Sequence, residues 1–530
     1  MNYIVTSRQM KTAEENANRK GITFSAMMDN AGNACYKQLV KIVGEVRDMA
    51  FVVLCGRGNN GGDGIVLASK IKEHGGLALC VFVSDLPSSA CAREKYAKHC
   101  KSDIHDSEPL NYALYTHRED IIEKALLNCD VIIDCVFGTG FDGELEPKLA
   151  SLFKFVNLNC NVLKISVDIP SGVNPDTGKV AESAFMPAVT FMLGAAKKGL
   201  FSHPCFDFSG NLILLDIGIP DECYTEYEAV FVGEEILKHI PVRKKSSHKG
   251  DFGKLLNIAG SEKYIGAALL SSKAALKCGA GIVTLASVRE VCRSIAPAIP
   301  ELTYIPLYAD GDGFADTEAA ATVKEKLSGF SAVALGCGIG IAPQTWDLVE
   351  TVLKNAVCPI ILDADGIYLL SLNINVLKEN DSSSISNANS VRKSKVILTP
   401  HPLEFSRLTG LSVHEIQSDR IRRAREFATK WDTVVVLKGV NTVIAAPDGQ
   451  VFMNITGNPG LAKGGTGDVL TGIIGSFAAQ GVKPLEAALL GVYLHGLVAD
   501  RLAESVALPG LMPSDIADFL PFVMKEIAVI

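Results

Sequence analysis

The residues best suited to catalysis lie in the glycine-rich run Gly464-Gly465-Thr466-Gly467-Asp468, which directly precedes an apolar segment. A glycine-rich turn that opens a helix directs several free backbone N–H groups toward one point and forms an anion site. Asp468 would repel a phosphate there unless it accepts a proton from a nearby hydroxyl. The run therefore predicts phosphoryl chemistry on a hydroxyl-bearing substrate. The alternative is a tight turn in which Asp468 only caps a helix.

A second glycine-rich loop, Gly56-Arg57-Gly58-Asn59-Asn60-Gly61, follows a predicted strand and precedes a predicted helix. It matches the GxGxxG spacing of a Rossmann NAD site, with Asp85 placed like a ribose-binding acid. Asp63 argues against that interpretation, because a carboxylate in the first turn of the helix opposes a pyrophosphate. The Asn59 and Asn60 amides indicate instead a loop that grips a polar ligand. The loop also lacks the Gly-Lys-Ser/Thr sequence of a Walker loop.

Two further strand ends carry polar residues in the same half of the chain. Asp134 follows one predicted strand, and Asp168 and Ser171 follow the next. Ligands gather at the carboxyl ends of parallel strands. Asn60, Asp134 and Ser171 offer hard oxygen donors, which suit a hard monovalent or divalent cation. Taken singly, an aspartate at a strand end is more often a turn former.

The composition limits the partners and the compartment. A net charge of −8 argues against nucleic acid or an anionic membrane, since both require a basic face. The 14 cysteines form no CxxC pair and no zinc spacing, as is typical of a reduced protein. The sequence has no signal-peptide pattern and no apolar run of membrane-spanning length, so we expect a cytoplasmic protein.

Buried-strand patterns alternate with helical patterns along the whole chain, which predicts an α/β protein with parallel sheets. A basic, polar segment at 242–250 interrupts this alternation, and we place a domain boundary before it, giving domains 1–233 and 234–530. A run rich in serine and asparagine at 378–395 predicts a surface loop. The predicted strands are 51–54, 79–83, 131–133, 162–167, 255–258, 332–335, 360–362, 396–398 and 433–437.

Three motifs of the first half, NNGGDG, DCVFGTGFDGE and DIPSGVN, occur in an order that resembles the epimerase domain of the NAD(P)H-hydrate repair enzymes. The resemblance implies a Rossmann-like three-layer α/β/α domain that interconverts the R and S forms of hydrated NADH or NADPH. It implies that Asp168 contacts the substrate, and we choose Asp168 as the proton-transfer residue. It also implies a potassium ion at Asn60, Asp134 and Ser171. The remaining implied substrate-binding residues are Asn59, Asn60, Gly61, Gly62, Asp63, Gly138, Thr139, Gly140, Phe141, Asp142, Gly143 and Glu144.

The second half carries its own ordered motifs: HKGDFGK, AGSEKYIGA, LGCGIG, LTPHPLEF, LKGVNT and the GGTGD run. Each is weak alone, since a glycine-rich loop can be a packing turn and a lone histidine is usually structural. His401, however, lies between two prolines after a predicted strand, which is a rigid and exposed placement.

Together these motifs resemble the ADP- or ATP-dependent NAD(P)H-hydrate dehydratases, which have a ribokinase-like fold. The resemblance implies Mg²⁺ with the nucleotide, and two departures from the family pattern are Cys337, in place of proline, and Lys463, in place of a small residue. The implied nucleotide-binding residues are Lys438, Gly439, Val440, Asn441, Thr442 and Gly467. The implied hydrate-binding residues are Ala267, Gly338, His401 and Asp468.

The combined resemblance predicts one bifunctional enzyme for hydrated NADH and NADPH. Asp468 would deprotonate the ring hydroxyl as it attacks the terminal phosphate of ADP or ATP, and loss of phosphate would restore the dihydronicotinamide. Two alternatives stay open: a true small-molecule kinase, and a first half that serves only as a binding or scaffold module. We expect a homo-oligomer that binds neither nucleic acid nor membrane.

Overall fold

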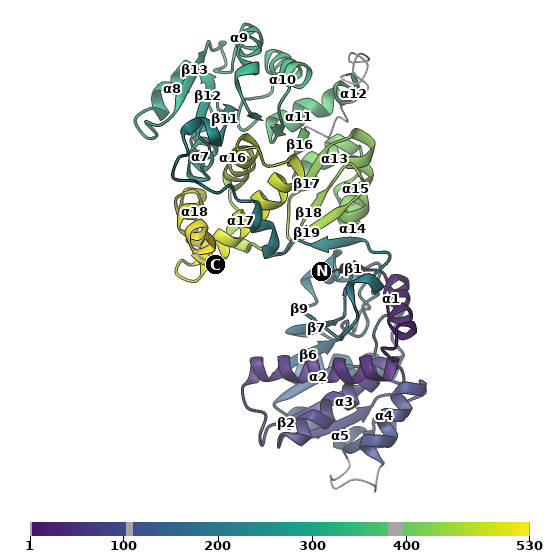
Figure 1. Ribbon diagram of the computed structural model, residues 1–530. Coiled ribbons are helices and arrows are strands. Elements are labelled where there is room, and N and C mark those ends of the chain that lie inside the picture. The colour runs from purple at the N-terminus through teal and green to yellow at the C-terminus, as the bar shows by residue number, and fades with distance from the viewer. Residues whose placement is uncertain (1–2, 102–109, 380–395, 529–530) are drawn as a thin grey trace. The chain divides into compact units, whose positions relative to one another are not determined.

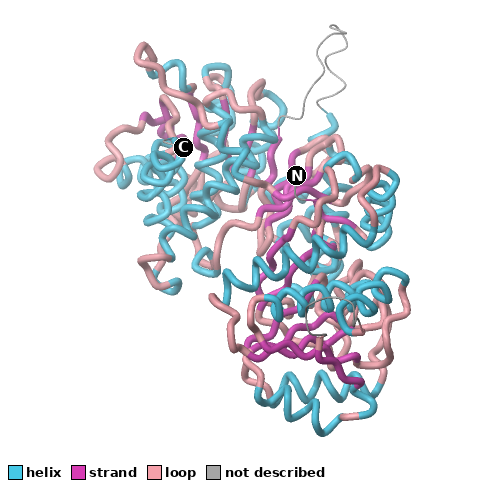
Figure 2. The backbone as a smooth tube through the Cα atoms, turned by 60° about the horizontal axis from the view of Figure 1, so that its bottom comes forward, coloured by secondary structure: helices cyan, strands magenta, loops and turns pink. Residues whose placement is uncertain are grey.

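The computed structural model describes residues 3–101, 110–379 and 396–528 of the 530-residue chain (Figures 1 and 2). The chain divides into two compact units, Met1–Val230 and Phe231–Ile530. Each unit alternates strands with helices, so the predicted α/β class is confirmed. The predicted surface loop at 378–395 lies, from residue 380 onward, outside the described residues.

The first unit contains a seven-stranded sheet within its described residues, in the order β4-β3-β2-β5-β6-β7-β9. Every neighbouring pair in it is parallel. The strand order reverses between β2 and β5, which is the topological switch point where α/β sheets bind ligands. The strands are β2 (Ala50–Cys55), β3 (Leu77–Phe82), β4 (Asn111–Leu114), β5 (Val131–Cys135), β6 (Leu163–Val167), β7 (Val189–Leu193) and β9 (Asn211–Leu215).

Helices cover both faces of this sheet, which gives the three layers predicted. One buried cluster joins one face to α2 (Phe24–Val43), α3 (Asn59–Glu73) and α4 (Ala90–Cys100). The other joins the opposite face to α5 (Glu119–Asn128) and α6 (Pro147–Asn159). Alternate residues of β2 belong to different clusters, as a strand buried on both sides requires. Beside the sheet, β1 (Tyr3–Val5) leads into α1 (Ser7–Arg19) and pairs with β8 (Ala196–Lys197) and β10 (Ala229–Phe231).

The second unit also has a mainly parallel sheet, which runs β13-β12-β11-β14-β15-β16-β17-β18-β19. The pairs from β13 to β17 are parallel, and β17, β18 and β19 form an antiparallel ribbon. The strands are β11 (Lys254–Ile258), β12 (Ile282–Val288), β13 (Thr303–Leu307), β14 (Ala332–Leu335), β15 (Ile360–Leu362), β16 (Val396–Leu398), β17 (Val434–Leu437), β18 (Thr442–Ala445) and β19 (Val451–Asn454).

The helices of the second unit form two groups (Figure 1). In the first, α16 packs on α7, α17 and α18 and on three central strands. This group comprises α7 (Ile265–Lys277), α16 (Thr466–Ala479), α17 (Pro484–Ala503) and α18 (Pro513–Ala528). Helix α8 (Arg289–Ile295) packs on α7 and on β12 and β13. The second group comprises α9 (Ala319–Lys324), α10 (Pro343–Asn355), α11 (Asp365–Leu372), α12 (Val376–Glu379), α13 (Pro402–Thr409), α14 (Val413–Ser418) and α15 (Arg420–Trp431). Four sequence motifs of this half lie at the carboxyl ends of strands: AGSEKYIGA after β11, LGCGIG after β14, LTPHPLEF after β16 and LKGVNT after β17.

Candidate active sites

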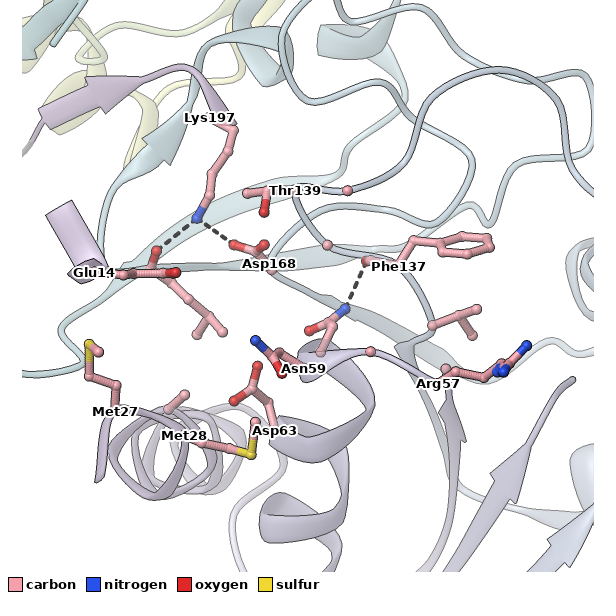
Figure 3. A pocket seen from close by; sticks show the side chains of 18 of the residues that line it. Glu14, Met27, Met28, Arg57, Asn59, Asp63, Phe137, Thr139, Asp168 and Lys197 are labelled. Atoms are coloured by element: carbon pink, nitrogen blue, oxygen red, sulfur yellow. Dashed lines mark hydrogen bonds and ion pairs between the residues drawn. The ribbon is translucent and has the colours of Figure 1, made fainter. Parts of the chain in front are cut away.

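A cavity of about 520 Å³ opens at the switch point of the first unit, between the carboxyl ends of β2 and β5 (Figure 3). The loop after β2 and the loop after β5 line it, together with side chains from α1 and α2. Seven residues predicted from the sequence lie in its lining: Asn59, Asn60, Asp63, Gly138, Thr139, Gly140 and Asp168.

The other predicted substrate-binding residues lie outside this lining, and most of them pack against or bond to neighbouring residues. Gly61 and Gly62 face the Gly56 carbonyl and the Met28 side chain so closely that a Cβ atom would clash. The Phe141 ring stacks near Phe137, with centroids 5.0 Å apart. Three exposed residues complete the set: Gly143, Asp142, which accepts a hydrogen bond from Asn174, and Glu144, which is 3.6 Å from Lys179. The alternative ribose-binding acid, Asp85, is exposed and also outside the lining.

One detail of the sequence analysis is wrong. Helix α3 begins at Asn59, after Gly58 in an extended conformation, and its first turn contains no acidic residue. Asp63 therefore lies in the second turn, because Asn59 and Asn60 are helical residues and not part of the preceding loop. The Asp63 carboxylate therefore does not oppose a pyrophosphate from the first turn of this helix, although Asp63 still lines the cavity.

Asp168 has the most constrained position in the cavity. Its backbone φ is +71°, a left-handed conformation that costs a residue with a side chain about 1 kcal/mol or more. Its carboxylate accepts a hydrogen bond from the buried Lys197 amine, which also donates to the carbonyls of Leu193 (2.8 Å) and Ala195 (3.0 Å). The strained backbone and the fixed ion pair hold the carboxylate toward the loop of Gly138.

Besides the exposed Glu146, two other carboxyl groups line the same cavity, those of Glu14 and Asp63. Neither Glu14 nor Lys197 was predicted from the sequence. In Figure 3 the carboxyl groups of Glu14 and Asp168 both lie near the Lys197 amine, which donates to Asp168 and to backbone carbonyls. Burial raises the pKa of Glu14 to about 7; the Lys197 charge lowers it, and the Asp168 charge adds to the increase. Burial, then the charges of Asp168 and Glu14, raise the pKa of Asp63 well above its ordinary value. The cavity therefore holds carboxyl groups that keep protons near neutral pH.

The three residues predicted to hold potassium lie together at the wall of this cavity, and they differ in whether their oxygen atoms already have hydrogen-bond partners. Asn60 donates from Nδ2 to the carbonyls of Phe137 (2.8 Å) and Val167 (3.0 Å), while its buried Oδ1 has no partner. An unpartnered buried oxygen fits a cation ligand. Asp134 is fully buried and its carboxylate accepts four hydrogen bonds, from Ser171 N–H and O–H, Val136 N–H and Ser166 O–H. Because these hydrogen bonds occupy both of its oxygens, Asp134 fits a negative charge beside the proposed cation site.

In the second unit, Asp468 lies in the first turn of α16. The helix begins after Gly465, with φ +100° and no side-chain cap. The Thr466 N–H donates to the Lys463 carbonyl (3.4 Å), and the N–H groups of Gly467 and Asp468 can face an anion. Burial raises the pKa of Asp468 to about 6, and the negative charge of Asp363 adds to the increase. The Cys337 thiol donates to this carboxylate and lowers its pKa, as Lys438 also does.

A buried ion pair stands beside this helix end. The Lys438 amine is 2.7 Å from Asp363, which also accepts a 2.7 Å hydrogen bond from Thr471 on α16. A Cβ atom on Gly467 would lie 3.4 Å from the Lys438 amine and 3.5 Å from Asp363, so these groups crowd one point. Burial opposes the charged form of Lys438, but Asp363 and Glu404 outweigh it and raise the pKa of the amine. Asp363 was missed from the sequence, although it follows β15 directly.

His401 has a clear structural role in the same region. It caps α13: its Nδ1 accepts from the N–H groups of Leu403 and Glu404, both at 3.2 Å. Burial and the Lys438 charge lower its pKa, so the ring is neutral at physiological pH. Glu404, 3.2 Å from Nε2 of His401 and 4.0 Å from Lys438, links the two residues, and burial raises its pKa to about 7.

The remaining predicted residues frame the same edge of the sheet. Gly338, with φ +67°, lies so close to Tyr264 and Ala267 that a Cβ atom would reach both side chains. Lys438 to Thr442 connect β17 to β18, and this turn contains Gly439 (φ +146°), the exposed Val440 and Asn441 (φ +54°). The Thr442 hydroxyl closes the turn by donating to the Gly439 carbonyl.

Two residues near the GGTGD turn have other partners. Lys463 donates to the carbonyls of Pro509 (2.7 Å) and Leu511 (2.8 Å), and so joins the turn to the segment before α18. His495 on α17 was not singled out by its sequence context. Burial and the Lys438 charge lower its pKa to about 4, and its buried Nε2 has no hydrogen-bond partner.

Within residues 3–101, 110–379 and 396–528, every helix is too short or too polar to span a membrane. No three or more His, Cys, Asp or Glu side chains of these residues are arranged to hold a metal ion.

Comparison with known proteins assigns both units. Residues 25–199 match the family described as YjeF-related protein N-terminus, and residues 255–521 match the family described as NAD(P)H-hydrate dehydratase. A bifunctional NAD(P)H-hydrate repair enzyme of Moorella thermoacetica is 34% identical, covering 99% of this chain and 97% of its own. Its counterpart in Escherichia coli K12 is 31% identical, covering 95% and 90%.

A solved structure is similar to the second unit. It is an ADP/ATP-dependent NAD(P)H-hydrate dehydratase from Bacillus subtilis, co-crystallised with ATP and Mg²⁺. It is 36% identical and covers 56% of this chain and 99% of its own, with a TM-score of 0.46. The family matches and the full-length relatives confirm the resemblance found in the motifs of both halves, and the chain belongs to the bifunctional NAD(P)H-hydrate repair enzymes.

Proposed function

We propose that the protein repairs hydrated NADH and NADPH by two successive reactions. In the hydrate, water has added across a ring double bond, and the hydroxyl is on the carbon beside the ring nitrogen in either the R or the S configuration. The first unit interconverts the two epimers. The second unit removes the hydroxyl from the S form with ADP or ATP and regenerates the reduced cofactor.

For the epimerase reaction, Asp168 is the proposed acid/base residue. Its ion pair with Lys197 and its left-handed backbone support this role, because both fix the carboxylate at the cavity wall. The residues Asn59, Asn60, Asp63 and those from Gly138 to Gly140 would surround the damaged ring. Asn60, Asp134 and Ser171 would hold a potassium ion, Asn60 through its unpartnered Oδ1. The ion would supply a fixed positive charge near the substrate.

For the dehydratase reaction, Asp468 would accept the proton of the ring hydroxyl as its oxygen attacks the terminal phosphorus of the nucleotide. The bond from phosphorus to the bridging oxygen breaks, so ADP leaves AMP and ATP leaves ADP. The neighbouring ring carbon then loses a proton as the carbon–oxygen bond breaks, which releases phosphate and restores the double bond. Phosphate is a far better leaving group than hydroxide, which is the reason for the phosphoryl transfer.

The nucleotide would lie between the start of α16 and the turn after β17. Lys438, Gly439, Val440, Asn441, Thr442 and Gly467 would contact it, and Ala267, Gly338 and His401 would face the hydrate with Asp468. Magnesium would enter with the nucleotide and neutralise phosphate charge. The single observation that carries the proposal is the Asp468 carboxyl group at a helix start without a side-chain cap, beside the partly buried Lys438.

The free thiols of all 14 cysteines support a reducing compartment, and we propose a cytoplasmic location. A fluorescent fusion observed in the source cells would test this location.

The test is to incubate the protein with a mixture of R and S hydrates of NADH and with ADP or ATP, and to follow the recovery of reduced-nicotinamide absorbance. Consumption of both epimers agrees with both activities. Consumption of the S form alone would refute the epimerase assignment. A stable phosphorylated product would favour a small-molecule kinase instead.

A further inference from the structure

Glu14 is a carboxyl group in the epimerase cavity that neither the sequence motifs nor the mechanism above uses. It lies on α1, on the turn between the buried Ala13 and Ala17, and it lines the cavity. Its carboxyl group lies in the same part of the cavity as the Lys197 amine and the Asp168 carboxylate (Figure 3), and the charges of both residues act on its pKa. Three separate segments of the chain therefore direct carboxyl groups into one space: α1 with Glu14, α3 with Asp63, and the loop after β6 with Asp168.

The balance of charge around Lys197 bears on the protonation of Glu14. An ammonium group has three hydrogens, and those of Lys197 already have acceptors in Asp168, Leu193 and Ala195. Apart from the exposed Arg57 and Glu146, the cavity lining holds one positive charge, Lys197, and three carboxyl groups. Like charges in a low-dielectric cavity cannot all remain ionised. At least one of the three therefore carries a proton and is able to donate it.

Epimerisation at a carbon that bears a hydroxyl beside a nitrogen needs two proton transfers in each direction. One group takes the hydroxyl proton as the oxygen forms a carbonyl. The carbon–nitrogen bond breaks, its electron pair stays on the nitrogen, and a second group supplies the proton that the nitrogen receives. After rotation, the nitrogen attacks the opposite face of the carbonyl, and both protons return to the groups from which they came. Atoms and charge are conserved, and no other reactant is needed.

We propose that Glu14 is this second group: it donates a proton to the ring nitrogen while the ion-paired Asp168 accepts the proton of the hydroxyl. The inference rests on the proposed epimerase function of the first unit. It assigns the two proton-transfer roles to two different residues: Lys197 holds Asp168 as the acceptor, and Glu14, which is not bonded to Lys197, is the donor.

The titration of Glu14 agrees with this role. Burial raises its pKa to about 7, so it holds a proton at and below neutral pH. The groups that face it are Lys197, which lowers its pKa, and Asp168 and Glu15, which raise it. Asp63 and Tyr224 also interact with it, and its own charge raises the pKa of both. A donor near its pKa at working pH is the most effective general acid.

The variant Glu14→Gln tests the assignment in the full-length protein, since glutamine keeps the shape and loses the exchangeable proton. Loss of a general acid should lower kcat for epimerisation about 100-fold, with little change in KM. The wild-type kcat should fall as the pH rises through about 7, and this fall should be absent in the variant. Glu15→Gln is the matched control, because Glu15 is adjacent on the same helix, with Arg19 3.9 Å away.

Each outcome has a defined meaning. A Glu14→Gln protein with wild-type kcat and a wild-type pH profile would overturn the inference. Equal thermal unfolding and equal dehydratase activity in the two variants and the wild type exclude misfolding as the cause of any loss. If the wild type itself gives no epimerisation above the protein-free rate, the proposed function fails and not only the role of Glu14. If Glu14→Asp restores the pH-dependent limb, the carboxyl proton is responsible.

Discussion

The two candidate sites use the same pair of residue types, an aspartate and a buried lysine, in opposite ways. In the first unit, Lys197 pairs with Asp168, the proposed acid/base group itself. In the second unit, Lys438 pairs with Asp363, and the proposed base Asp468 stands beside that pair without sharing it. Lys197 therefore stabilises the charged form of the proposed catalytic residue, whereas Lys438 is paired with Asp363, which is not the proposed base.

The different use of the lysine in the two sites matches the different charge of their proposed substrates. The epimerase cavity pairs Lys197 with Asp168 and has two further carboxyl groups with raised pKa, those of Glu14 and Asp63. This arrangement suits a proton exchange that leaves the substrate's charge unchanged. At the dehydratase site, an open helix start and the partly buried Lys438 favour an incoming phosphate. There the pKa of Asp468 is raised to about 6, in part because Asp363 is negative nearby.

The variant that separates the two sites most strongly is Asp468→Asn. Removal of the general base should lower dehydration about 1,000-fold, while epimerisation stays at the wild-type rate. Recovery of reduced-nicotinamide absorbance measures the first activity, and chromatographic separation of the epimers measures the second. Normal dehydration by this variant would show that Asp468 does not act as the base.

Asp168→Asn is the corresponding change in the first unit. We expect epimerisation to fall about 100-fold, with dehydration intact, because asparagine also tolerates a positive φ and should preserve the backbone. The change leaves the buried Lys197 without its carboxylate, so the thermal unfolding temperature should also fall. The double variant Asp168→Asn with Lys197→Met should recover much of that temperature and none of the activity; a recovery of epimerisation would exclude Asp168 as the acid/base.

The variant Asp363→Asn tests whether Asp363 fixes the position of the Lys438 amine. Without the ion pair, Lys438 should lose its fixed place, and KM for the nucleotide should rise about tenfold, a loss of ~1.4 kcal/mol. KM for the hydrate should change little. Thr471→Val removes the other hydrogen bond of Asp363 and serves as the control, with a smaller expected effect. Equal effects of the two variants would mean that Asp363 acts through α16 and not through Lys438.

The pH dependence of the two activities should run in opposite directions. Asp468 must be ionised to act as a base, so dehydration should increase as the pH rises through about 6 and be about tenfold slower at pH 5 than at pH 8. Because its folded-state pKa is raised, ionisation of Asp468 destabilises the fold above that pKa and not below its ordinary value. Asp468→Asn should therefore unfold at a higher temperature than the wild type at pH 8, with no difference at pH 3.

The smallest effect is expected from Lys463→Met. Lys463 departs from the family pattern next to the proposed phosphate site, but its amine donates to the carbonyls of Pro509 and Leu511. We expect a slightly lower unfolding temperature and an unchanged KM for the nucleotide. A clear rise of that KM at low salt, absent at high salt, would instead indicate an electrostatic contact with the nucleotide.

Much of this arrangement follows from the sequence, because parallel strands place their carboxyl ends at one edge. Asp168 was found in this way, whereas Asp468 was found from its glycine-rich run and Lys438 from the family resemblance. Asp363 follows the strand-end rule in a segment that no motif marked. Glu14 and Lys197 were missed for a physical reason. Glu14 lies on an otherwise ordinary amphipathic helix, and Lys197 belongs to a two-residue strand. Only tertiary packing brings their charges together.

The left-handed backbone at Asp168 also bears on how this protein family can change. A single nucleotide substitution converts an aspartate codon into one for Asn, Gly, His, Tyr, Val, Ala or Glu. Of these, Gly and Asn accept a positive φ with the least strain. The mutations that the fold tolerates best are thus ones that delete the carboxylate. A lineage that no longer needs the reaction loses it in one step and retains a folded, ligand-sized cavity that selection can adapt to binding alone.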